Sequence, residues 1–262
     1  MGAKPVAMIF DVDGTLADTE RDGHRPAFNQ AFAEAGLDWH WSVEEYGRLL
    51  RITGGKERMR AFMQDNPIKN KEISEIDALI ASLHDAKNRY YAAMVRAGGI
   101  PLRPGVERLL AEARQHGIRL TIATTTTRTN VVALLEANLG PEALDWFEII
   151  ATADEVPDKK PSPAVYAYVL QGLGLEAGDC LALEDSQNGL QAAHAAGLPT
   201  LVTINDYTRD DALASAELII DQFGEPGEPM HVLGGIWAQR LSTGAQYIDL
   251  KVLGQLMDNQ PE

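Results

Sequence analysis

Short, uninterrupted runs of apolar residues recur along the chain. The first, residues 6–10, stops at Asp11. Such runs are typical of strands buried on both faces of a parallel sheet. Further strands are predicted at residues 120–123, 147–150, 181–183, 198–202 and 218–220, with helical patterns between most of them at residues 106–116, 130–139, 163–173 and 189–196. Strands that alternate with helices predict an α/β fold, a Rossmann-like doubly wound parallel sheet.

One long interval interrupts this alternation. From about residue 19 to 99 the pattern is only helical, most clearly at 25–35, 43–50 and 73–97, and it closes on a return hinge at 98–101. Roughly eighty residues exceed any ordinary connection within an α/β unit. The sequence therefore predicts an inserted helical domain. The predicted boundaries are 1–17 and 100–222 for the core, 18–99 for the insert and 223–262 for a C-terminal extension without an assigned role.

Composition and charge restrict the possible partners. The 262 residues carry a net charge of −15, with an isoelectric point near 4.8. Such a field repels nucleic acid and anionic lipid, and no apolar run approaches the roughly 18 residues of a membrane span. With neither a secretory signal nor a transit peptide in view, and Cys180 as the only cysteine, we expect a cytoplasmic protein. A monomer is the default expectation, because the inserted domain can supply the shielding that a neighbouring subunit would otherwise give. A phosphorylated substrate would also be repelled, so it would require local positive charge or a metal.

The residues after each predicted strand are the candidates for chemistry, since open α/β sheets form their sites at the carboxyl ends of strands. Asp11 and Asp13 lie two positions apart and project to the same side of an extended chain. One carboxylate can attack phosphorus and the other can exchange protons with the leaving group and water. An ordinary solvated turn is the alternative interpretation, because Asp-Gly is a common turn dipeptide.

Three further polar clusters end predicted strands. A threonine hydroxyl at Thr124 or Thr125 can hold phosphoryl oxygens, although threonines also cap helices. Lys160 can offset the charge of an attacking carboxylate and a phosphate, or lie in a surface loop. Glu184 and Asp185 suit a hard cation such as Mg²⁺, or begin the next helix. The occurrence of all these clusters at strand ends of one sheet is harder to explain by such ordinary roles.

The same residues carry a family resemblance. DVDGTL at 11–16, Thr124, Lys160 in KPSP and LEDSQNG at 183–189 occur in the order of the haloacid-dehalogenase superfamily, which the chain resembles from about residue 5 to 222. The resemblance implies a Mg²⁺-dependent enzyme with Asp11 as nucleophile and metal ligand. Asp13 would be the general acid/base and lend its backbone carbonyl to the metal. The implied phosphate ligands are Thr124, Thr125 and Lys160, and the further metal ligands are Asp185 and Glu184, the latter through a water.

The inserted domain resembles the four-helix cap that closes over the site in part of this superfamily. Residues 48–60, RLLRITGGKERMR, hold five bases and one acid, and they can grip a second phosphate or form an exposed helix face. The cap residues expected to contact substrate are Glu20, His24, Arg51, Gly55, Lys56 and Arg58. The runs DGTLADTERDGHR at 13–25 and TGGKER at 53–58 together resemble the CbbY-type members, which are similar to phosphatases that act on xylulose 1,5-bisphosphate.

Several alternatives remain at this point. The acid at position 13 favours phosphoryl transfer over carbon–halogen cleavage, because true dehalogenases lack it. A sugar phosphomutase of the β-phosphoglucomutase type shares every core motif. A phosphonate hydrolase would use Lys56 to form an imine, and a non-catalytic binding protein would share only the fold. The preferred interpretation is a phosphatase acting on a small phosphorylated sugar.

Overall fold

The computed structural model describes residues 4–52, 54–67, 73–241 and 244–257. The chain divides into two compact units. The core unit comprises Met1–Asp18 and Pro101–Glu262, and the inserted unit comprises Thr19–Ile100.

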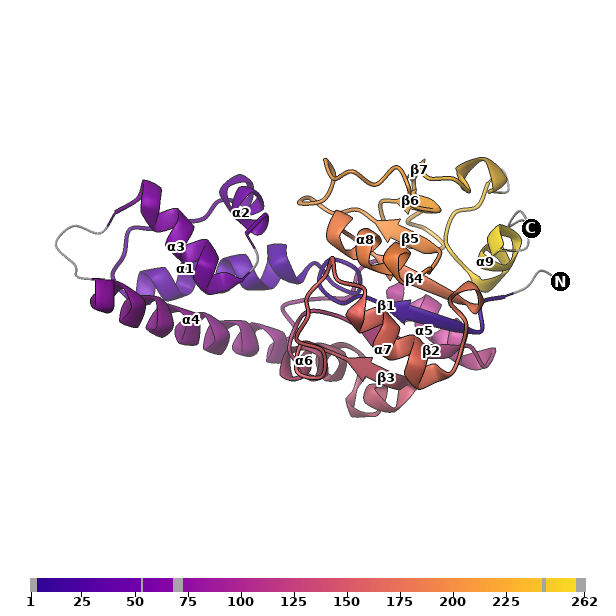
Figure 1. Cartoon of the computed structure of the whole chain (residues 1–262), viewed down its shortest axis with the longest axis horizontal. Coiled ribbons are helices and arrows are strands. Elements are labelled where there is room, and N and C mark those ends of the chain that lie inside the picture. The colour runs from indigo at the N-terminus through magenta and orange to yellow at the C-terminus, as the bar shows by residue number, and fades with distance from the viewer. Residues whose placement is uncertain (1–3, 53, 68–72, 242–243, 258–262) are drawn as a thin grey trace. The chain divides into compact units, whose positions relative to one another are not determined.

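The core unit is built on one seven-stranded sheet in the order β3-β2-β1-β4-β5-β6-β7 (Figure 1). Strands β1 to β6 run parallel to one another, and β7 runs antiparallel to β6. The predicted α/β fold class is confirmed. The strands are β1 (Ala7–Phe10), β2 (Arg119–Ala123), β3 (Phe147–Ala151), β4 (Cys180–Glu184), β5 (Thr200–Thr203), β6 (Leu218–Ile220) and β7 (Val232–Gly234).

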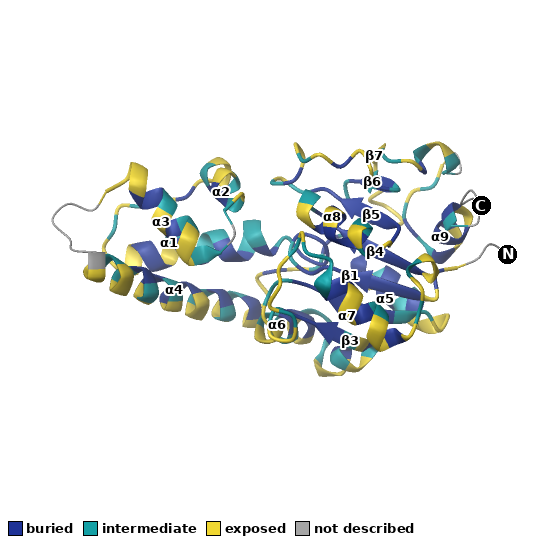
Figure 2. Cartoon of the chain, viewed as in Figure 1, coloured by how far each residue is buried: buried dark blue, intermediate teal, exposed yellow. Residues whose placement is uncertain are grey.

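Helices cover both faces of this sheet. In Figure 1, α7 and α8 lie in front of the strands and α5 lies behind them. Strands β1, β4 and β5 are buried along their whole length, which explains their largely apolar sequence (Figure 2). The core helices are α5 (Val106–Gln115), α6 (Arg128–Leu139), α7 (Ala164–Leu173), α8 (Gln187–Ala195) and α9 (Leu250–Met257), with short 3-10 turns η2 (Pro141–Trp146), η3 (Ala177–Asp179) and η4 (Ala238–Arg240).

The C-terminal segment packs into the core unit. Strand β7 extends the sheet, and α9 contacts α5. Arg108 of α5 contacts this segment at two points. Its guanidinium lies 4.5 Å from the ring centre of Tyr247 and 3.3 Å from a carboxylate oxygen of Glu225. The Leu250 amide donates to the Glu112 carboxylate at 3.2 Å. The described part of the predicted extension therefore completes the core instead of hanging from it.

The inserted unit is helical. Its elements are the π-helix η1 (Thr19–His24), α1 (Arg25–Glu34), α2 (Val43–Leu50), α3 (Gly55–Asp65) and α4 (Ile73–Arg96). Helix α1 packs along α4, and an aromatic cluster fills the interior. The cluster consists of Phe28, Phe32, Trp41, Tyr46 and Phe62.

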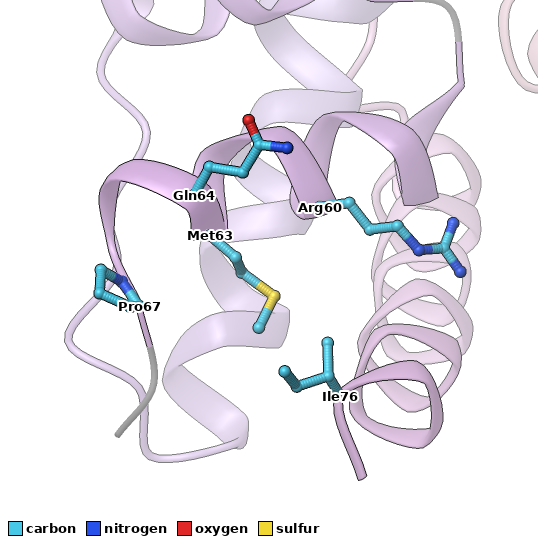
Figure 3. A pocket seen from close by; sticks show the side chains of 5 residues that line it. All are labelled: Arg60, Met63, Gln64, Pro67 and Ile76. Atoms are coloured by element: carbon cyan, nitrogen blue, oxygen red, sulfur yellow. The ribbon is translucent and has the colours of Figure 1, made fainter. Parts of the chain in front are cut away.

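Two further observations concern surfaces. A surface hollow of about 250 Å³ in the inserted unit is lined by Arg60, Met63, Gln64, Pro67 and Ile76 (Figure 3). Of these residues only Arg60 belongs to the basic run at 48–60, and none of them is a predicted substrate contact. Among the described helices, none combines the length and the apolar character that crossing a membrane requires.

Candidate active site

The candidate catalytic residues meet where the order of the strands reverses. Strand β1 lies between β2 and β4, so the next strands along the chain add on opposite sides of it. The register pairs Phe10 with Ile122 on one side and with Leu183 on the other. The polar residues that follow these three strands therefore converge at one edge of the sheet, as expected for a doubly wound fold.

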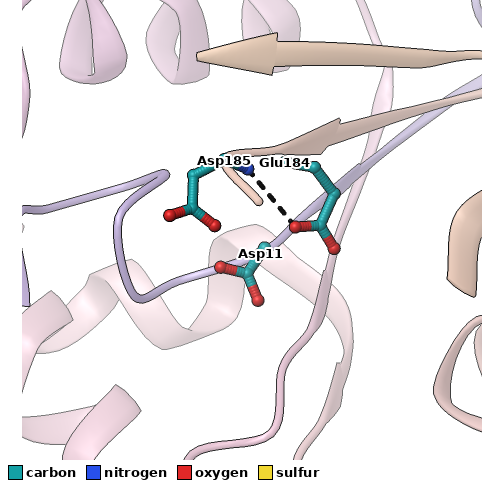
Figure 4. Close-up of side chains that lie close together, drawn as sticks. All are labelled: Asp11, Glu184 and Asp185. Carbon is teal, nitrogen blue, oxygen red and sulfur yellow. Dashed lines mark hydrogen bonds between the residues drawn. The ribbon is translucent and has the colours of Figure 1, made fainter. Parts of the chain in front are cut away.

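Three buried carboxylates form the centre of this site (Figure 4). Oxygens of Asp11, Glu184 and Asp185 all lie within 4.8 Å of one another, and none of the three residues is more than 7% exposed. Burial, reinforced by the charges of Glu184 and Asp13, raises the pKa of Asp11 to about 8. Burial and the charges of Asp11 and Glu184 likewise raise the pKa of Asp185 well above its ordinary value.

This excess of negative charge fits a divalent cation. Carboxylate oxygens are the donors that Mg²⁺ prefers, and a cation among them would relieve the repulsion that favours protonation. Asp11 and Asp185 would hold it, with the main chain at Asp13 beside them. Glu184 has other partners, described next.

Lys160 is the cation that bonds directly to two groups of this site, Asp11 and Glu184. Its ammonium donates to Asp11 Oδ1 at 2.7 Å, to Glu184 Oε1 at 2.6 Å and to the Ala123 carbonyl at 2.8 Å. Burial alone would lower the pKa of Lys160, but the charges of Asp11 and Glu184 outweigh it and raise the pKa. The lysine therefore stays charged and offsets the charge of the carboxylate pair.

Asp13 and the threonines lie at the ends of their strands as predicted. Asp13 is half-buried in a tight turn in which the Gly14 amide donates to the Ala17 carbonyl at 2.8 Å. Gly14 has a φ of 91°, which a residue without Cβ adopts readily. Thr124 is 2% exposed and its hydroxyl oxygen accepts from the Thr126 amide at 3.2 Å. The Thr124 hydroxyl thus serves the local turn and keeps its own proton to donate.

Three neighbours of the acids were not singled out from the sequence. The Tyr166 hydroxyl donates to Glu184, and burial raises the pKa of this phenol well above its ordinary value. Asn205 Nδ2 donates to Asp185 Oδ2 at 2.7 Å. A Cβ on Gly189 would lie only 1.8 Å from Glu184 Oε2, so this glycine makes room for the carboxylate. Tyr166 gives no signal beyond that of an apolar helix position, whereas Asn205 shortly follows an apolar run and is open to the strand-end argument.

In the inserted unit, Glu20 and Arg58 come together around a buried tyrosine. The Tyr46 hydroxyl donates to Glu20 Oε2 at 2.5 Å and accepts from Arg58 at 3.2 Å. Arg58 also lies 3.6 Å from Glu20 Oε1 and donates to the Ile52 carbonyl at 2.9 Å. Tyr46 therefore belongs to the interior and at the same time orients a predicted contact residue.

His24 lies in a second, cationic cluster of the inserted unit. Its ring stacks on Tyr91 with the centres 4.1 Å apart, and Lys87 lies 5.3 Å from the centre of the same tyrosine ring. Burial and the charges of Lys87 and Arg58 lower the pKa of His24 well below its ordinary value. The pKa of His84 is lowered by burial and by Lys87. In the sequence, Lys87 is one charged residue among several on a long helix, and nothing there marks it as part of this cluster.

The basic run at 48–60 does not form one continuous basic surface. Arg48 pairs with Glu45, and Arg60 lies 3.0 Å from Asp77. Arg51 is exposed at the end of α2, and Lys56 is exposed in the first turn of α3, directly after Gly55. The predicted local charge of +4 is therefore partly neutralised by acids from elsewhere in this unit.

Comparisons with known proteins agree with this geometry. A family model described as haloacid dehalogenase-like hydrolase matches residues 6–197. The chain is 51% identical to the plasmid-borne protein CbbY of Cupriavidus necator over 88% of this chain and 92% of that protein. It is 52% identical to protein CbbY of Rhodobacter capsulatus, covering 80% and 90%. A solved structure of a CbbY variant from Rhodobacter sphaeroides in complex with xylulose-(1,5)bisphosphate superposes with a TM-score of 0.73 at 44% identity, covering 83% and 94%.

Proposed function

The chain belongs to the haloacid dehalogenase-like hydrolases and is a phosphatase of that family, and from this premise we propose that it hydrolyses xylulose 1,5-bisphosphate to xylulose 5-phosphate and inorganic phosphate. The observation that carries the proposal is the buried group in which Lys160 bonds both Asp11 and Glu184 beside Asp185. The similarity to CbbY proteins, one of them solved with this sugar bisphosphate, supports the choice of substrate.

The reaction proceeds in two displacements. A carboxylate oxygen of Asp11 attacks the phosphorus, and the bond between phosphorus and the sugar oxygen breaks as Asp13 gives that oxygen a proton. A water then loses its proton to Asp13 and attacks the aspartyl-phosphate, which releases phosphate and restores Asp11. Bound Mg²⁺ supplies positive charge to the phosphoryl oxygens and to the acids that hold it.

The remaining core residues hold charge in place. Lys160, 2.7 Å from Asp11, offsets the repulsion between the attacking carboxylate and the phosphoryl group. Glu184, whose carboxylate already accepts from Lys160 and Tyr166, fixes the lysine and acts beside the metal. Thr124 offers its hydroxyl proton to a phosphoryl oxygen, and Thr125 lies next to it.

The inserted unit would hold the phosphate that is not cleaved. Lys56 lies in the first turn of α3, where exposed amide groups and the helix dipole favour an anion. Gly54, with a φ of 103°, and Gly55 allow the backbone to approach a ligand. Arg58 and Glu20, linked through Tyr46, would contact the sugar or its phosphate together with His24 and Arg51.

A substrate panel tests this proposal. The purified protein with Mg²⁺ is offered xylulose 1,5-bisphosphate, ribulose 1,5-bisphosphate, xylulose 5-phosphate and glucose 1-phosphate, with phosphate release measured and products identified by mass and NMR. We expect xylulose 1,5-bisphosphate to have the highest kcat/KM and xylulose 5-phosphate to accumulate. A higher kcat/KM for another sugar phosphate would refute the substrate assignment. Formation of an isomeric sugar phosphate without net phosphate release would instead indicate a mutase.

A further inference from the structure

Arg103 is buried in the core unit, shortly after the chain re-enters it. The residue is only 8% exposed, and its guanidinium donates to four backbone carbonyls. These belong to three separate segments, at or just after the carboxyl ends of β1, β5 and β6. The acceptors are Gly14, Thr203 at 3.1 Å, Ile204 at 2.6 Å and Asp221 at 2.6 Å, and the Thr203 hydroxyl accepts as well at 3.0 Å.

Two of these contacts lie next to residues of the candidate active site. Gly14 directly follows Asp13, so the bond to its carbonyl restrains the turn that presents this acid. Ile204 directly precedes Asn205, whose side chain donates to Asp185 at 2.7 Å. A single guanidinium thus connects the backbone beside Asp13 to the backbone beside the partner of Asp185.

The main chain of Arg103 adds to this connection. Its amide donates to the Leu16 carbonyl at 2.9 Å, and its Nε lies 3.6 Å from the Asp18 carboxylate. The segment that leaves the catalytic turn is therefore held by the same residue. The turn from Gly14 to Asp18 contacts Arg103 at both ends.

Only arginine can make this set of bonds. Its guanidinium presents five N–H donors in a fixed plane, whereas a lysine ammonium is a compact charge with three donors on a flexible stem. A lysine at this position would keep the charge, but its three donors could not serve all of these acceptors. The substitution Arg103→Lys therefore separates geometry from charge.

We propose that Arg103 is a positioning residue, which holds Asp13 and Asp185 in catalytic geometry by tying the turn after β1 to the segment after β5. The inference rests on the proposed function in one respect, namely that the acids of the core bind Mg²⁺. It does not depend on which sugar phosphate is cleaved.

The test compares Arg103→Lys with wild type in two measurements. Calorimetric titration with Mg²⁺ in the absence of substrate should give an affinity about 10–100-fold lower, the range typical when the support of metal-binding carboxylates is removed. With saturating Mg²⁺, kcat should fall by about tenfold or more, while KM for the sugar bisphosphate changes less than about threefold. Arg103→Ala should recover part of the lost kcat when methylguanidine is added. A variant that had failed to fold would not recover.

Two other variants keep the test decisive. Arg119→Lys changes an arginine that pairs with Glu148 and bonds the Leu173 carbonyl at the opposite end of β2, and it should leave Mg²⁺ affinity and kcat unchanged. Asn205→Ala removes the side chain that bonds Asp185 and should lower Mg²⁺ affinity by about tenfold with little change in Tm.

The possible failures are distinguishable. If wild type did not bind Mg²⁺, the proposed function itself would fail. If wild type bound Mg²⁺ and Arg103→Lys matched it in affinity and kcat, the positioning role would be refuted. If Asn205→Ala bound Mg²⁺ with the affinity of wild type, the proposal that Arg103 positions Asp185 through Asn205 would be refuted.

Discussion

In the core unit the candidate catalytic side chains follow strand ends, whereas in the inserted unit the candidate substrate contacts come from helices and the turns between them. The core places Asp11, Glu184 and Asp185 within 4.8 Å of one another and holds them with buried donors. In the inserted unit, Lys56 and Arg51 are exposed. Arg58, Glu20 and His24 are held by partners within that unit. This difference suggests that the chemistry depends on fixed geometry and that recognition depends mainly on charge.

The largest effect is expected from Asp11→Asn, which removes the nucleophile and leaves the shape of the core. We expect kcat to fall by about a thousandfold or more, because an amide cannot form the aspartyl-phosphate. Tm should stay the same or rise, since one member of a repelling buried acid group becomes neutral. Phosphate release and thermal unfolding measure the two effects, and normal turnover would contradict the mechanism.

Gly189→Ala tests whether the core tolerates a shift of Glu184. The new Cβ would lie 1.8 Å from a Glu184 oxygen, so the carboxylate must move away from Lys160 and Tyr166. We expect kcat to fall by about 10–100-fold and stability to drop by about 1–3 kcal/mol. Gly178→Ala is the matched control, because nothing lies within 4 Å of its added Cβ. Equal kinetics for both variants would show that the position of Glu184 is unimportant.

Lys56→Ala tests recognition by charge in the inserted unit. Losing one charge-assisted contact to phosphate should raise KM for xylulose 1,5-bisphosphate by about tenfold. KM for a sugar monophosphate cleaved by the same enzyme should change less than about twofold, and kcat should stay similar for both. Lys251→Ala, at an exposed position of α9, is the control. Equal changes for mono- and bisphosphate would rule out a second phosphate at Lys56.

The smallest effect concerns the pH dependence of stability. The pKa of buried His24 is well below 6.5, so below that pH the unfolded chain binds a proton that the folded chain does not. Stability should therefore fall as the pH drops below 6.5, by at most about 1.4 kcal/mol per pH unit for this residue. Thermal unfolding of His24→Gln between pH 7.5 and 5.5 should show a shallower slope than wild type. Part of the slope should remain, because the pKa of His84 is lowered as well; an unchanged slope would contradict the prediction.

The sequence predicted most of the core because its strands and helices carry strong local patterns. The helix predicted at 106–116 is observed as Val106–Gln115, and the strand predicted at 181–183 as Cys180–Glu184. Strand β7 was missed, since Val232–Gly234 is a short, largely exposed edge strand that ends on glycine. Helix α3 was considered only as the alternative interpretation of residues 48–60, because Gly54 and Gly55 resemble a loop and its interior is rich in charge.

The residues of the candidate site also divide into those that a local sequence pattern marks and those that it does not. Asp11, Lys160 and the Glu184–Asp185 pair each follow a strand, so the parallel order of the sheet was enough to predict that they meet. Arg103 could not be found in this way, because its acceptors lie 89 to 118 residues away and no local pattern marks them. Lys87 and Tyr46 depend on how helices pack in the inserted unit, which periodicity does not specify.

The pairing of Ala17 with Leu102 has a consequence for how such a chain could be remodelled. Ala17 and Leu102 lie on either side of the inserted unit and are paired inside the core unit. If the insert were removed, the two chain ends left in the core would therefore be neighbours. Closing a gap between neighbours costs little conformational entropy, and that cost grows only slowly with the length of the bridging chain. Residues 19–100 could therefore be exchanged for a segment of different length or sequence while the strand order is kept. Substrate range could then diversify within one continuous stretch of the gene, while the two stretches on either side keep the chemical step.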